Sequence, residues 1–359
     1  MSLITYLTRI HFADGVLDDA LAEEMRNLGI VRPLLITDRA GEADTVFEPL
    51  SDALPGQATP IRIHQRADVV TREAAEQAQE SYRVQGCDGI IGFGGASALG
   101  LARLTGAGID PAAPVITIPT TLGGIGLEPL GLPHQTSVSQ RSRRRRIPSA
   151  ILCDPSLVQT GEPASAAAAG IDILSHCVEA FLGTTFNPPA DGMALEGARR
   201  AFGNIERAVE DQSDRAARRE LMAASVCAGL AAEKGLGGLE ALSCAFELES
   251  GCREQHGHFH AALLKPVLGF NKPAVGGRFE VIRGAIGLPP KTDLPDALAD
   301  MASSLGLPER LGAASSCTEK LTPSVLERAA DHAAAHAANR TNPRHATARD
   351  YLSLLETAI

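Results

Sequence analysis

The segment DGIIGFGGASALGLAR, residues 88–103, joins an apolar run to a glycine-rich turn and a helical pattern. The run 88–95 is typical of a buried strand, and the small residues that follow permit a tight turn into a helix. Such a turn lets the backbone approach a pyrophosphate, and the helix N-terminus offers unpaired N–H donors. The spacing is not the usual G-x-G-x-x-G, and tight packing explains such turns about as often as a ligand does. The segment predicts a strand–turn–helix unit and leaves both interpretations of its glycines open.

Strand-like runs and helical patterns alternate through the first part of the chain. Buried strands separated by helices need crossover connections, which produce a mostly parallel sheet. From Glu162 onward, alanine-rich segments with a period of 3.6 residues follow one another and runs of β-branched residues disappear. We therefore expect an α/β domain over residues 1–161 and an all-α domain over residues 162–359. The further strand-like runs are residues 33–38, 114–121 and 149–155.

The composition excludes several classes of protein. A net charge of −10 and a pI near 5.5 argue against a nucleic-acid partner, whose binding domain is normally basic. The sequence shows neither a signal peptide nor an apolar run of membrane length, so no membrane partner is expected. Seven cysteines without C-x-x-C spacing suit reduced thiols. These features predict a soluble, cytoplasmic protein.

The segment GIDILSHCVEAF, residues 170–181, places Asp172 and His176 four residues apart, with Glu179 a further turn on. On a helix, the side chains of Asp172 and His176 lie one turn apart on the same face. A carboxylate and an imidazole on an otherwise apolar helix look like two arms of a metal site. Two donors cannot hold a catalytic metal, so other ligands must come from elsewhere in the chain.

The segment HGHFH, residues 256–260, contains three histidines beside an apolar stretch. His256 and His260 share one face if this segment is helical, and their density favours a polar site over a structural role. His332 and His336 have the same spacing. Their alanine-rich surroundings indicate that both face solvent.

Polar residues also stand at two strand ends. Asp38 could bond an adenosine ribose and favour NAD over NADP, although a helix-capping or turn aspartate is the commoner interpretation. Thr120 and Thr121 present hydroxyls at a glycine-rich strand exit, which could equally be a plain exit. The basic run QRSRRRRIP, residues 140–148, is best interpreted as a solvated hairpin.

Together these motifs resemble a known family. The order GGAS, IPTT, GID-x-x-x-H-x-x-E and then HG followed by P-x-x-x-FN is similar to that of iron-containing (group III) alcohol dehydrogenases. The maleylacetate reductase branch is more similar still, because Gly100 stands where alcohol dehydrogenases carry aspartate. The pair His256 and His260 and the terminal TNPRHATARDYLSLL, residues 341–355, also resemble this branch.

The resemblance implies a dehydroquinate synthase-like fold, in which a nucleotide-binding α/β domain precedes a helical domain and catalysis occurs in the cleft between them. It also implies a homodimer. NAD would bind with its pyrophosphate on the glycine-rich turn and its ribose near the end of an earlier strand. The residues implied in cofactor binding are Asp38, Gly94, Gly95, Ala96, Ser97, Thr120 and Thr121.

The resemblance further implies a metal site for iron or zinc, with Asp172, His176 and His256 as three of four ligands. Relatives place a histidine ligand and a second histidine four residues later before the HG motif. Aligned on Cys244, these positions fall on Ala241 and Ala245, so the fourth corner is expected to be a methyl group. Substitutes for the missing ligand are His258, His260 or Glu240. Alternatively the site is metal-free, and His176, His256 and His260 act as oxyanion or proton donors.

The leading functional prediction is an NAD(H)-dependent oxidoreductase resembling maleylacetate reductase. It would transfer hydride to a small acidic substrate with a carbonyl group, such as a product of aromatic ring cleavage. Arg253 and Lys265 are candidate anchors for the anion.

Two other functions compete with this prediction. One is a metal-dependent alcohol or aldehyde dehydrogenase with a three-ligand site. The other is a catalytically silent homologue that binds a dinucleotide or a partner subunit, supported by the lost histidines and an altered turn at residues 123–128.

Overall fold

The computed structural model describes residues 4, 8–38, 47–56, 58, 60–64, 70–125, 127, 147–158, 162–252, 254–313 and 316–359. Contacts divide the chain into two compact units. The described residues between Thr8 and Val158 form the first, called here the sheet unit. Those from Glu162 onward belong to the second, called the helical unit. The basic run falls almost wholly outside the described residues.

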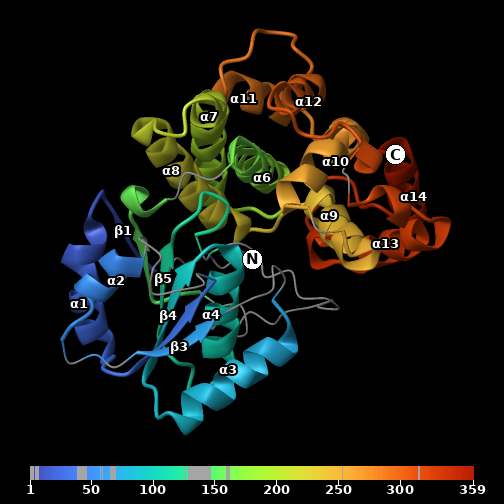
Figure 1. The fold of residues 1–359 in the computed structure, drawn as a ribbon. Coiled ribbons are helices and arrows are strands. Elements are labelled where there is room, and N and C mark those ends of the chain that lie inside the picture. Colours follow the sequence, from blue (N-terminus) through green and yellow to red (C-terminus); the bar gives the residue numbers. More distant parts are fainter. Residues whose placement is uncertain are drawn as a thin grey trace. The chain divides into compact units, whose positions relative to one another are not determined.

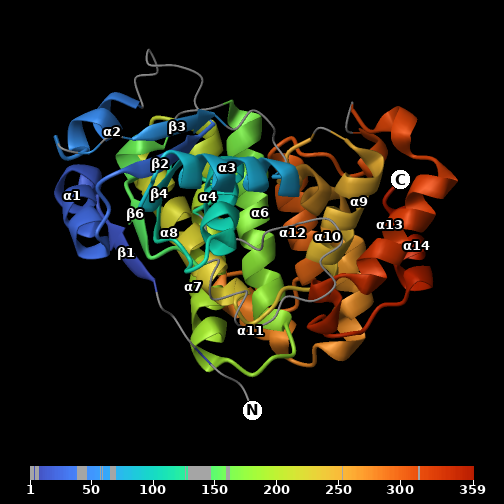
Figure 2. The same cartoon turned by 90° about the horizontal axis from the view of Figure 1, so that it is seen from below.

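A six-stranded sheet organises the sheet unit, and every recorded strand pair in it is parallel (Figures 1 and 2). The strand order is β1-β6-β5-β4-β2-β3. Because Thr37 pairs with Phe93 and Gly94 pairs with Pro119, the carboxyl ends of β2, β4 and β5 lie at one edge. The strands are β1 (Arg9–Phe12), β2 (Pro33–Thr37), β3 (Ile61–His64), β4 (Gly89–Gly94), β5 (Val115–Pro119) and β6 (Ala150–Cys153).

Helices cover both faces of the sheet, which explains why every residue of β2, β4, β5 and β6 is buried. Leu35 and its same-face neighbours pack with α1 and α2 in one core cluster. Leu34 and Ile36 point the other way and pack with α3 and α4, which lie together in Figure 2. The helices are α1 (Val16–Leu28), α2 (Phe47–Ala53), α3 (Arg72–Val84) and α4 (Ala96–Gly108), and the 3-10 helix η1 (Pro155–Leu157) follows β6.

The helical unit is built around α6, which packs against α7, α8 and α10. Its helices are α6 (Pro163–Leu182), α7 (Pro188–Glu210), α8 (Arg215–Ala232), α9 (Gly238–Ser250), α10 (His256–Asn271), α11 (Arg278–Ala285), α12 (Leu294–Ser304), α13 (Pro323–Ala335) and α14 (Ala348–Thr357). Short 3-10 helices are η2 (Lys272–Ala274), η3 (Leu311–Ala313), η4 (Thr318–Lys320) and η5 (Ala337–Arg340). Helix α6 has the length and apolarity of a membrane span, but 83% of its most apolar window is buried inside the protein. A helix buried to this extent is typical of the protein core.

Two segments that carried the resemblance meet in this unit. The side-chain amides of Asn271 and Asn342 bond each other in both directions, at 2.9 and 2.8 Å. Asn342 also accepts a hydrogen bond from the backbone N–H of Gly238 at the start of α9. The amide pair therefore joins α9, α10 and the segment before α14.

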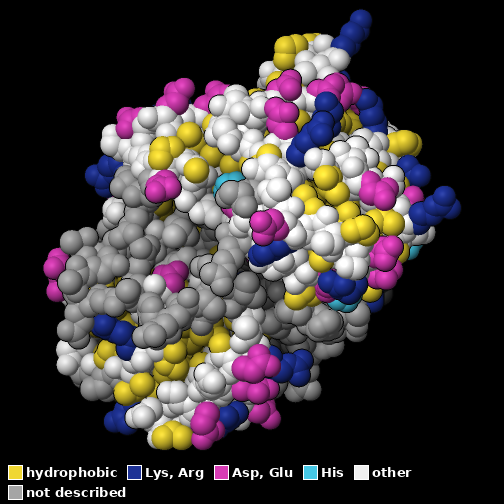
Figure 3. Space-filling model, turned by 45° about the vertical axis from the view of Figure 1, so that its right-hand side comes forward, with side chains coloured by type: hydrophobic (Ala, Val, Ile, Leu, Met, Phe, Trp, Pro, Cys, Tyr) yellow, Lys and Arg dark blue, Asp and Glu magenta, His cyan; other side chains and the backbone are white. Residues whose placement is uncertain are grey.

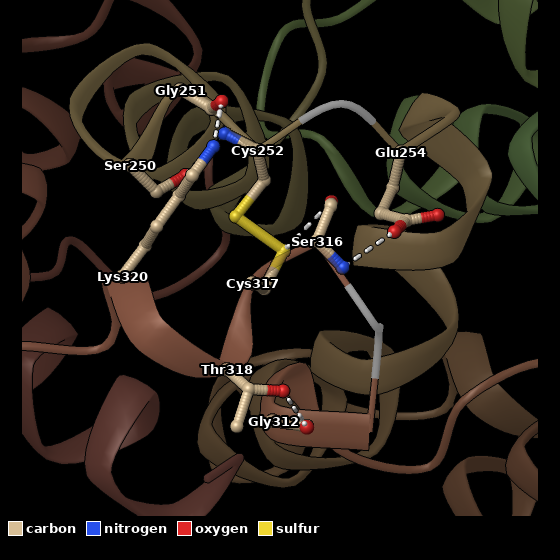
Figure 4. Close-up of a disulfide and its surroundings, with 9 residues drawn as sticks. All are labelled: Ser250, Gly251, Cys252, Glu254, Gly312, Ser316, Cys317, Thr318 and Lys320. Carbon is tan, nitrogen blue, oxygen red and sulfur yellow. Dashed lines mark hydrogen bonds between the residues drawn. A yellow bond between two sulfur atoms is a disulfide. The ribbon is translucent and has the colours of Figure 1, made fainter.

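The cysteine prediction is wrong for two of the seven residues. Cys252 and Cys317 form a disulfide across 65 residues, and the other five cysteines are free (Figure 4). The spacing of cysteines in the sequence does not predict this pair, because the two residues meet only where η4 packs against the loop between α9 and α10. On the face drawn in Figure 3, acidic and basic side chains are interspersed among the coloured residues.

Candidate active site

The predicted cofactor residues of the sheet unit meet at the carboxyl edge of β2, β4 and β5. Asp38 Oδ2 accepts a hydrogen bond of 2.8 Å from the backbone N–H of Gly95. A Cβ atom on Gly94, whose φ is 148°, would overlap the Asp38 carboxylate, and one on Gly95 would lie 3.1 Å from it. The close approach of Asp38 therefore requires both glycines, which supports the packing interpretation of the turn.

The start of α4 lies at the same edge. Gly95 is the N-cap of the helix, and Ala96 and Ser97 form its partly exposed first turn. The N–H of Thr120 bonds the carbonyl of Gly94 at 2.9 Å, and the hydroxyl of Thr121 would lie 3.3 Å from a Cβ atom on Gly95. All seven predicted residues thus gather around one strand-to-helix turn. In the altered turn, residues 126 and 128 lie outside the described residues.

In the helical unit, two helices bring four predicted residues together. Helix α6 carries Asp172 and His176 one turn apart, and α10 carries His256 and His260 in the same way. One donor atom from each of the four lies within 4.8 Å of the others. The ring centroids of His256 and His260 are 4.4 Å apart, and those of His176 and His260 are 5.3 Å apart.

Helix α9 adds a fifth donor, Glu240. Its Oε2 atom lies 3.1 Å from His176 Nε2, 3.2 Å from His256 Nε2 and 3.7 Å from His260 Nε2. The carboxylate is almost completely buried. We call these five residues, Asp172, His176, Glu240, His256 and His260, the donor cluster.

The expectation of a methyl group at the fourth corner is therefore wrong. Ala241 and Ala245 are buried core residues, each one position beyond a residue that faces the cluster. One position corresponds to about 100° around a helix, so a one-residue error in alignment selects the wrong face. The site-facing pair on α9 is Glu240 and Cys244, whose thiol lies 3.3 Å from Glu240 Oε1.

The third polar residue of α6, Glu179, does not join the cluster but positions α9. Its buried carboxylate accepts hydrogen bonds from the backbone N–H groups of Gly237, Leu239 and Glu240, at 3.1, 2.6 and 3.0 Å. These are N–H groups that a helix N-terminus leaves unpaired. Glu179 therefore determines where α9 begins and which of its side chains faces α6.

A close contact between helices brings His256 to the cluster. A Cβ atom on Gly257 would overlap the carbonyl oxygen of Ala168 on α6. Only glycine allows the two backbones to approach so closely. The glycine of the HG motif is therefore explained by packing. The ring of His256 itself is oriented by Glu247 of α9, whose Oε2 lies 3.2 Å from His256 Nδ1.

The loop before His256 is held at several points (Figure 4). The disulfide of Cys252 ties it to η4, and Lys320 bonds the carbonyl of Gly251. Glu254 accepts a hydrogen bond of 3.2 Å from the backbone of Ser316. This anchoring limits the movement of the N-terminus of α10.

The charges of the donor cluster move its pKa values in different directions. Burial lowers the pKa of His176, but the carboxylates beside it outweigh burial and raise it to about 9. The pKa of His256 is raised well above its usual value, since bonds to two glutamates outweigh burial. Burial and the neighbouring His256 lower the pKa of His260 to about 4. Despite burial, the imidazoles hold the pKa of Glu240 well below its usual value.

Three buried atoms of the cluster lack hydrogen bonds to any described residue, namely Asp172 Oδ1 and both ring nitrogens of His260. Asp172 Oδ1 lies 3.2 Å from His260 Nδ1. Buried polar atoms normally have partners, so atoms without them indicate a missing ligand or ion. Imidazole nitrogens and carboxylate oxygens are also the donors that zinc and iron take. The residues present therefore fit a divalent metal.

Other predicted residues lie outside the cluster. His258 is partly exposed and contacts the carbonyl of Gln255. Lys265 forms a surface ion pair with Asp296, so it is not positioned as an anion anchor at the cluster. Arg253 lies outside the described residues.

The two histidines expected to face solvent each have a polar contact. His332 is partly exposed, and its Nδ1 lies 2.8 Å from Glu249. His336 is likewise partly exposed, and burial lowers its pKa. Its Nδ1 accepts a hydrogen bond from the backbone of Ala338.

Comparisons with known proteins agree with this geometry. A family model described as "Iron-containing alcohol dehydrogenase" matches residues 8–155, and "Fe-containing alcohol dehydrogenase family, C-terminal" matches residues 166–359. A 4-hydroxybutyrate dehydrogenase from Cupriavidus necator is 34% identical, with both chains covered completely. Maleylacetate reductase 1 from Cupriavidus pinatubonensis is 26% identical over 85% of this chain and 84% of its own. The solved structure of a 1,3-propanediol oxidoreductase covers all of both chains with a TM-score of 0.86 at 22% identity.

The chain combines a parallel α/β unit with a helical unit that carries a buried donor cluster, and its relatives define an oxidoreductase. More narrowly, the chain belongs to the iron-containing alcohol dehydrogenase family. Both the family and the two-part fold expected from the motifs are confirmed, and maleylacetate reductases are among the relatives. Membership implies NAD and iron or a similar metal as cofactors.

Proposed function

We propose that this oxidoreductase interconverts an alcohol and an aldehyde or ketone on a short substrate that also carries a carboxylate, using NAD(H). Bound NAD⁺ would supply the hydride acceptor for the carbinol carbon, and the hydroxyl proton would be released. The observation that supports this most is the buried donor cluster, in a chain similar over its full length to a 4-hydroxybutyrate dehydrogenase. Maleylacetate, the substrate named for other relatives, is also a small acid, but it carries a carbon–carbon double bond conjugated to a carbonyl group, so it shares the carboxylate and not the alcohol.

The sheet unit would bind the dinucleotide. Support comes from the exposed first turn of α4, whose N–H groups and dipole favour a pyrophosphate. We assign this role to Gly94, Gly95, Ala96, Ser97, Thr120 and Thr121, with Asp38 near the ribose. Since Asp38 also bonds Gly95, it would serve both the turn and the cofactor.

The helical unit would hold the metal through Asp172, His176 and His256. A bound divalent ion acts as a Lewis acid on a substrate oxygen. The remaining chemistry belongs to side chains. The side chains of His260 and His176 are 0% and 9% exposed, which excludes water, whereas His256 is 24% exposed. We place the substrate on the side of His256.

Two steady-state assays test the proposal with the full chain. NAD⁺ reduction is followed with 4-hydroxybutyrate, and 1-butanol, which lacks the carboxylate, is the control. NADH oxidation is followed with maleylacetate. Turnover of 4-hydroxybutyrate with at least tenfold lower kcat/KM for 1-butanol supports the proposal, whereas turnover of maleylacetate alone would assign reduction of a conjugated double bond instead. Higher kcat/KM with 1-butanol would indicate an ordinary alcohol dehydrogenase.

A silent homologue is the second candidate. It rested on the loss of two imidazoles, but the positions that face the site carry a carboxylate and a thiol, not methyl groups. Binding of NADH without turnover of any of these substrates would favour it. We further propose that the protein works as a cytoplasmic homodimer without nucleic-acid or membrane partners, and light scattering tests the dimer. A role in aromatic catabolism would follow only from activity with maleylacetate.

A further inference from the structure

We infer that Glu240 is a ligand of the metal, so that α9 supplies a carboxylate where relatives are expected to supply an imidazole. The inference rests on the metal site of the proposed function and specifies its chemistry. It replaces a three-ligand site by one with two carboxylates, Asp172 and Glu240, and two imidazoles, His176 and His256. The donor atoms of Asp172, His176, His256 and His260 lie within 4.8 Å of one another, and His256 also belongs to a second such set with Glu240 and Cys244.

The distances fit shared coordination. Two ligands that bind one metal at about 2.1 Å lie about 3.4 Å apart in a tetrahedral site and about 3.0 Å apart in an octahedral one. Glu240 Oε2 lies 3.1 Å from His176 Nε2 and 3.2 Å from His256 Nε2, within this range. Its distance of 3.7 Å to His260 Nε2 is longer. His260 is therefore the weaker partner of this oxygen.

The outer contacts of the ligands support the same assignment. Glu247 holds Nδ1 of His256, so Nε2 is the nitrogen directed at Glu240. A carboxylate behind a histidine in this way is the usual support of a metal ligand. On the other side, Cys244 contacts Glu240 Oε1, which leaves Oε2 as the oxygen that faces the imidazoles.

The buried carboxylate of Glu240 needs a positive charge beside it, which either protonated imidazoles or a bound metal ion can supply. All the recorded ion pairs of this buried carboxylate, among the described residues, are to imidazoles. Burial of an ionised carboxylate is costly unless a positive charge or metal compensates it. A divalent ion would neutralise the two carboxylates, and the imidazoles that bind it would then be neutral.

A ligand set of this kind changes which metal is favoured. Carboxylate oxygens suit manganese and iron better than they suit softer ions, whereas imidazole suits zinc, copper and iron. Compared with a site of one carboxylate and three imidazoles, this one should shift preference from zinc toward Fe²⁺ and Mn²⁺.

Cobalt binding tests the inference without any assay of turnover. The purified full chain is stripped with a chelator, and Co²⁺ is added as the probe. Binding is measured by equilibrium dialysis and by the visible absorption of the bound ion. We compare the wild type with Glu240→Gln, which keeps shape but loses charge, and with Glu240→His, which supplies an imidazole. Glu249→Gln on the same helix is the matched control, because Glu249 pairs with Arg328 and His332 outside the cluster.

We expect one Co²⁺ per wild-type chain and a dissociation constant at least a hundredfold higher for Glu240→Gln. Glu240→His should stay within about tenfold of wild type with an altered absorption spectrum, and Glu249→Gln should be unchanged. If Glu240→Gln fails to fold, Glu240→Asp replaces it, since the shortened carboxylate should weaken binding at least tenfold. Equal affinity of wild type and the folded position-240 variant would overturn the inference. So would failure of the wild type to bind Co²⁺.

Sulfur ligation is a distinct outcome that also overturns the inference. An intense sulfur-to-cobalt band that disappears in Cys244→Ser would make the thiol the α9 ligand. NADH titration separates these results from the proposed function. Turnover that survives chelation would contradict Glu240 as a metal ligand and leave the proposed oxidoreductase function intact. Co²⁺ binding without NADH binding would contradict the proposed function and leave the metal-ligand inference intact.

Discussion

The glycine-rich turn of the sheet unit and the donor cluster of the helical unit both contain a carboxylate at their centre, but they are assembled differently. The turn is continuous in sequence from Gly94 to Ser97, and only Asp38 and the β5 exit come from elsewhere. The cluster draws its five residues from α6, α9 and α10, and every contact in it crosses between helices or helical turns. A contiguous motif can be recognised from the sequence of one segment. The residues of a cluster can be identified only when it is known which face of each helix points inward.

The largest difference between the two regions should appear in catalysis. We expect His256→Ala to lower kcat about a thousandfold, because it removes a ligand at the reacting centre. NADH affinity should change less than twofold, since the dinucleotide residues lie in the sheet unit. Steady-state kinetics and NADH fluorescence titration measure the two effects. Wild-type kcat in this variant would move the chemistry away from the cluster.

The disulfide should matter most for the stability of the helical unit. In the chain-entropy picture, a loop of 65 residues closed by Cys252 and Cys317 contributes about 4 kcal/mol to the free energy of unfolding. Urea denaturation of Cys317→Ala against wild type measures this loss. In the denatured, unreduced wild type, five of the seven thiols should react with a thiol reagent, since two are paired. Seven reactive thiols would show that the pair is reduced in solution.

The contact of α10 with α6 should be nearly as sensitive. In Gly257→Ala the new methyl group would meet the backbone carbonyl of Ala168, and backbone cannot move aside as a flexible side chain can. We expect a loss of about 3 kcal/mol in unfolding free energy. Gly269→Ala on the same helix, where a Cβ atom meets nothing within 4 Å, is the matched control. Equal stability of the two variants would mean that the helices approach less closely.

A smaller effect should decide between the two roles of Asp38. Asp38→Asn keeps the side chain's size but removes the charge that repels a 2′-phosphate. We expect the ratio of NADPH to NADH affinity to rise about tenfold. If the ratio stays constant while the unfolding free energy falls, Asp38 holds only the Gly95 turn. Fluorescence titration with both cofactors provides the ratio.

The smallest effect should come from a carboxylate on the surface, in contrast to the buried ones. A hydrogen bond from Arg199, aided by Arg200, lowers the pKa of Glu196 to about 2 although slight burial opposes this. Since the folded-state pKa lies below the unfolded one, the stabilisation is present above about pH 4.5 and is lost as the pH falls toward 2. Because the pair is solvated, Glu196→Gln should cost no more than about 0.5 kcal/mol at pH 7 and nothing at pH 2. Urea denaturation at the two pH values measures this difference.

The sequence supported the fold and most of the cluster, but not all of it. Strand and helix periodicity predicts the parallel sheet and the helical half, and the spacing of four residues predicts both the Asp172–His176 and the His256–His260 pairs. The sequence indicates Glu240 only as a substitute ligand, because alignment on Cys244 places Ala241 at the site. Glu240 and Cys244 show the same four-residue spacing, which is the signal that could have identified them.

The remaining features could not be predicted because they depend on contacts between residues far apart in the sequence. The partner of Cys252 lies 65 residues away, and the partial burial of His336 follows from packing that its alanine-rich neighbours do not reveal. The domain boundary at residues 161 and 162 and the expected cleft stay predictions. The roles of the cofactor and metal residues stay proposals that the experiments above address.

Through Glu179, helix α6 fixes the rotation of α9 about its own axis. Because Glu179 binds the N–H groups of Gly237, Leu239 and Glu240, inserting one residue between Gly237 and Glu240 would rotate the later side chains by about 100° and swing a different residue inward. Exchanges at positions 240 and 244 leave that rotation unchanged. Proteins built on this scaffold can therefore vary the chemistry of the metal site by point substitution at two positions, while insertions at the start of α9 should be poorly tolerated.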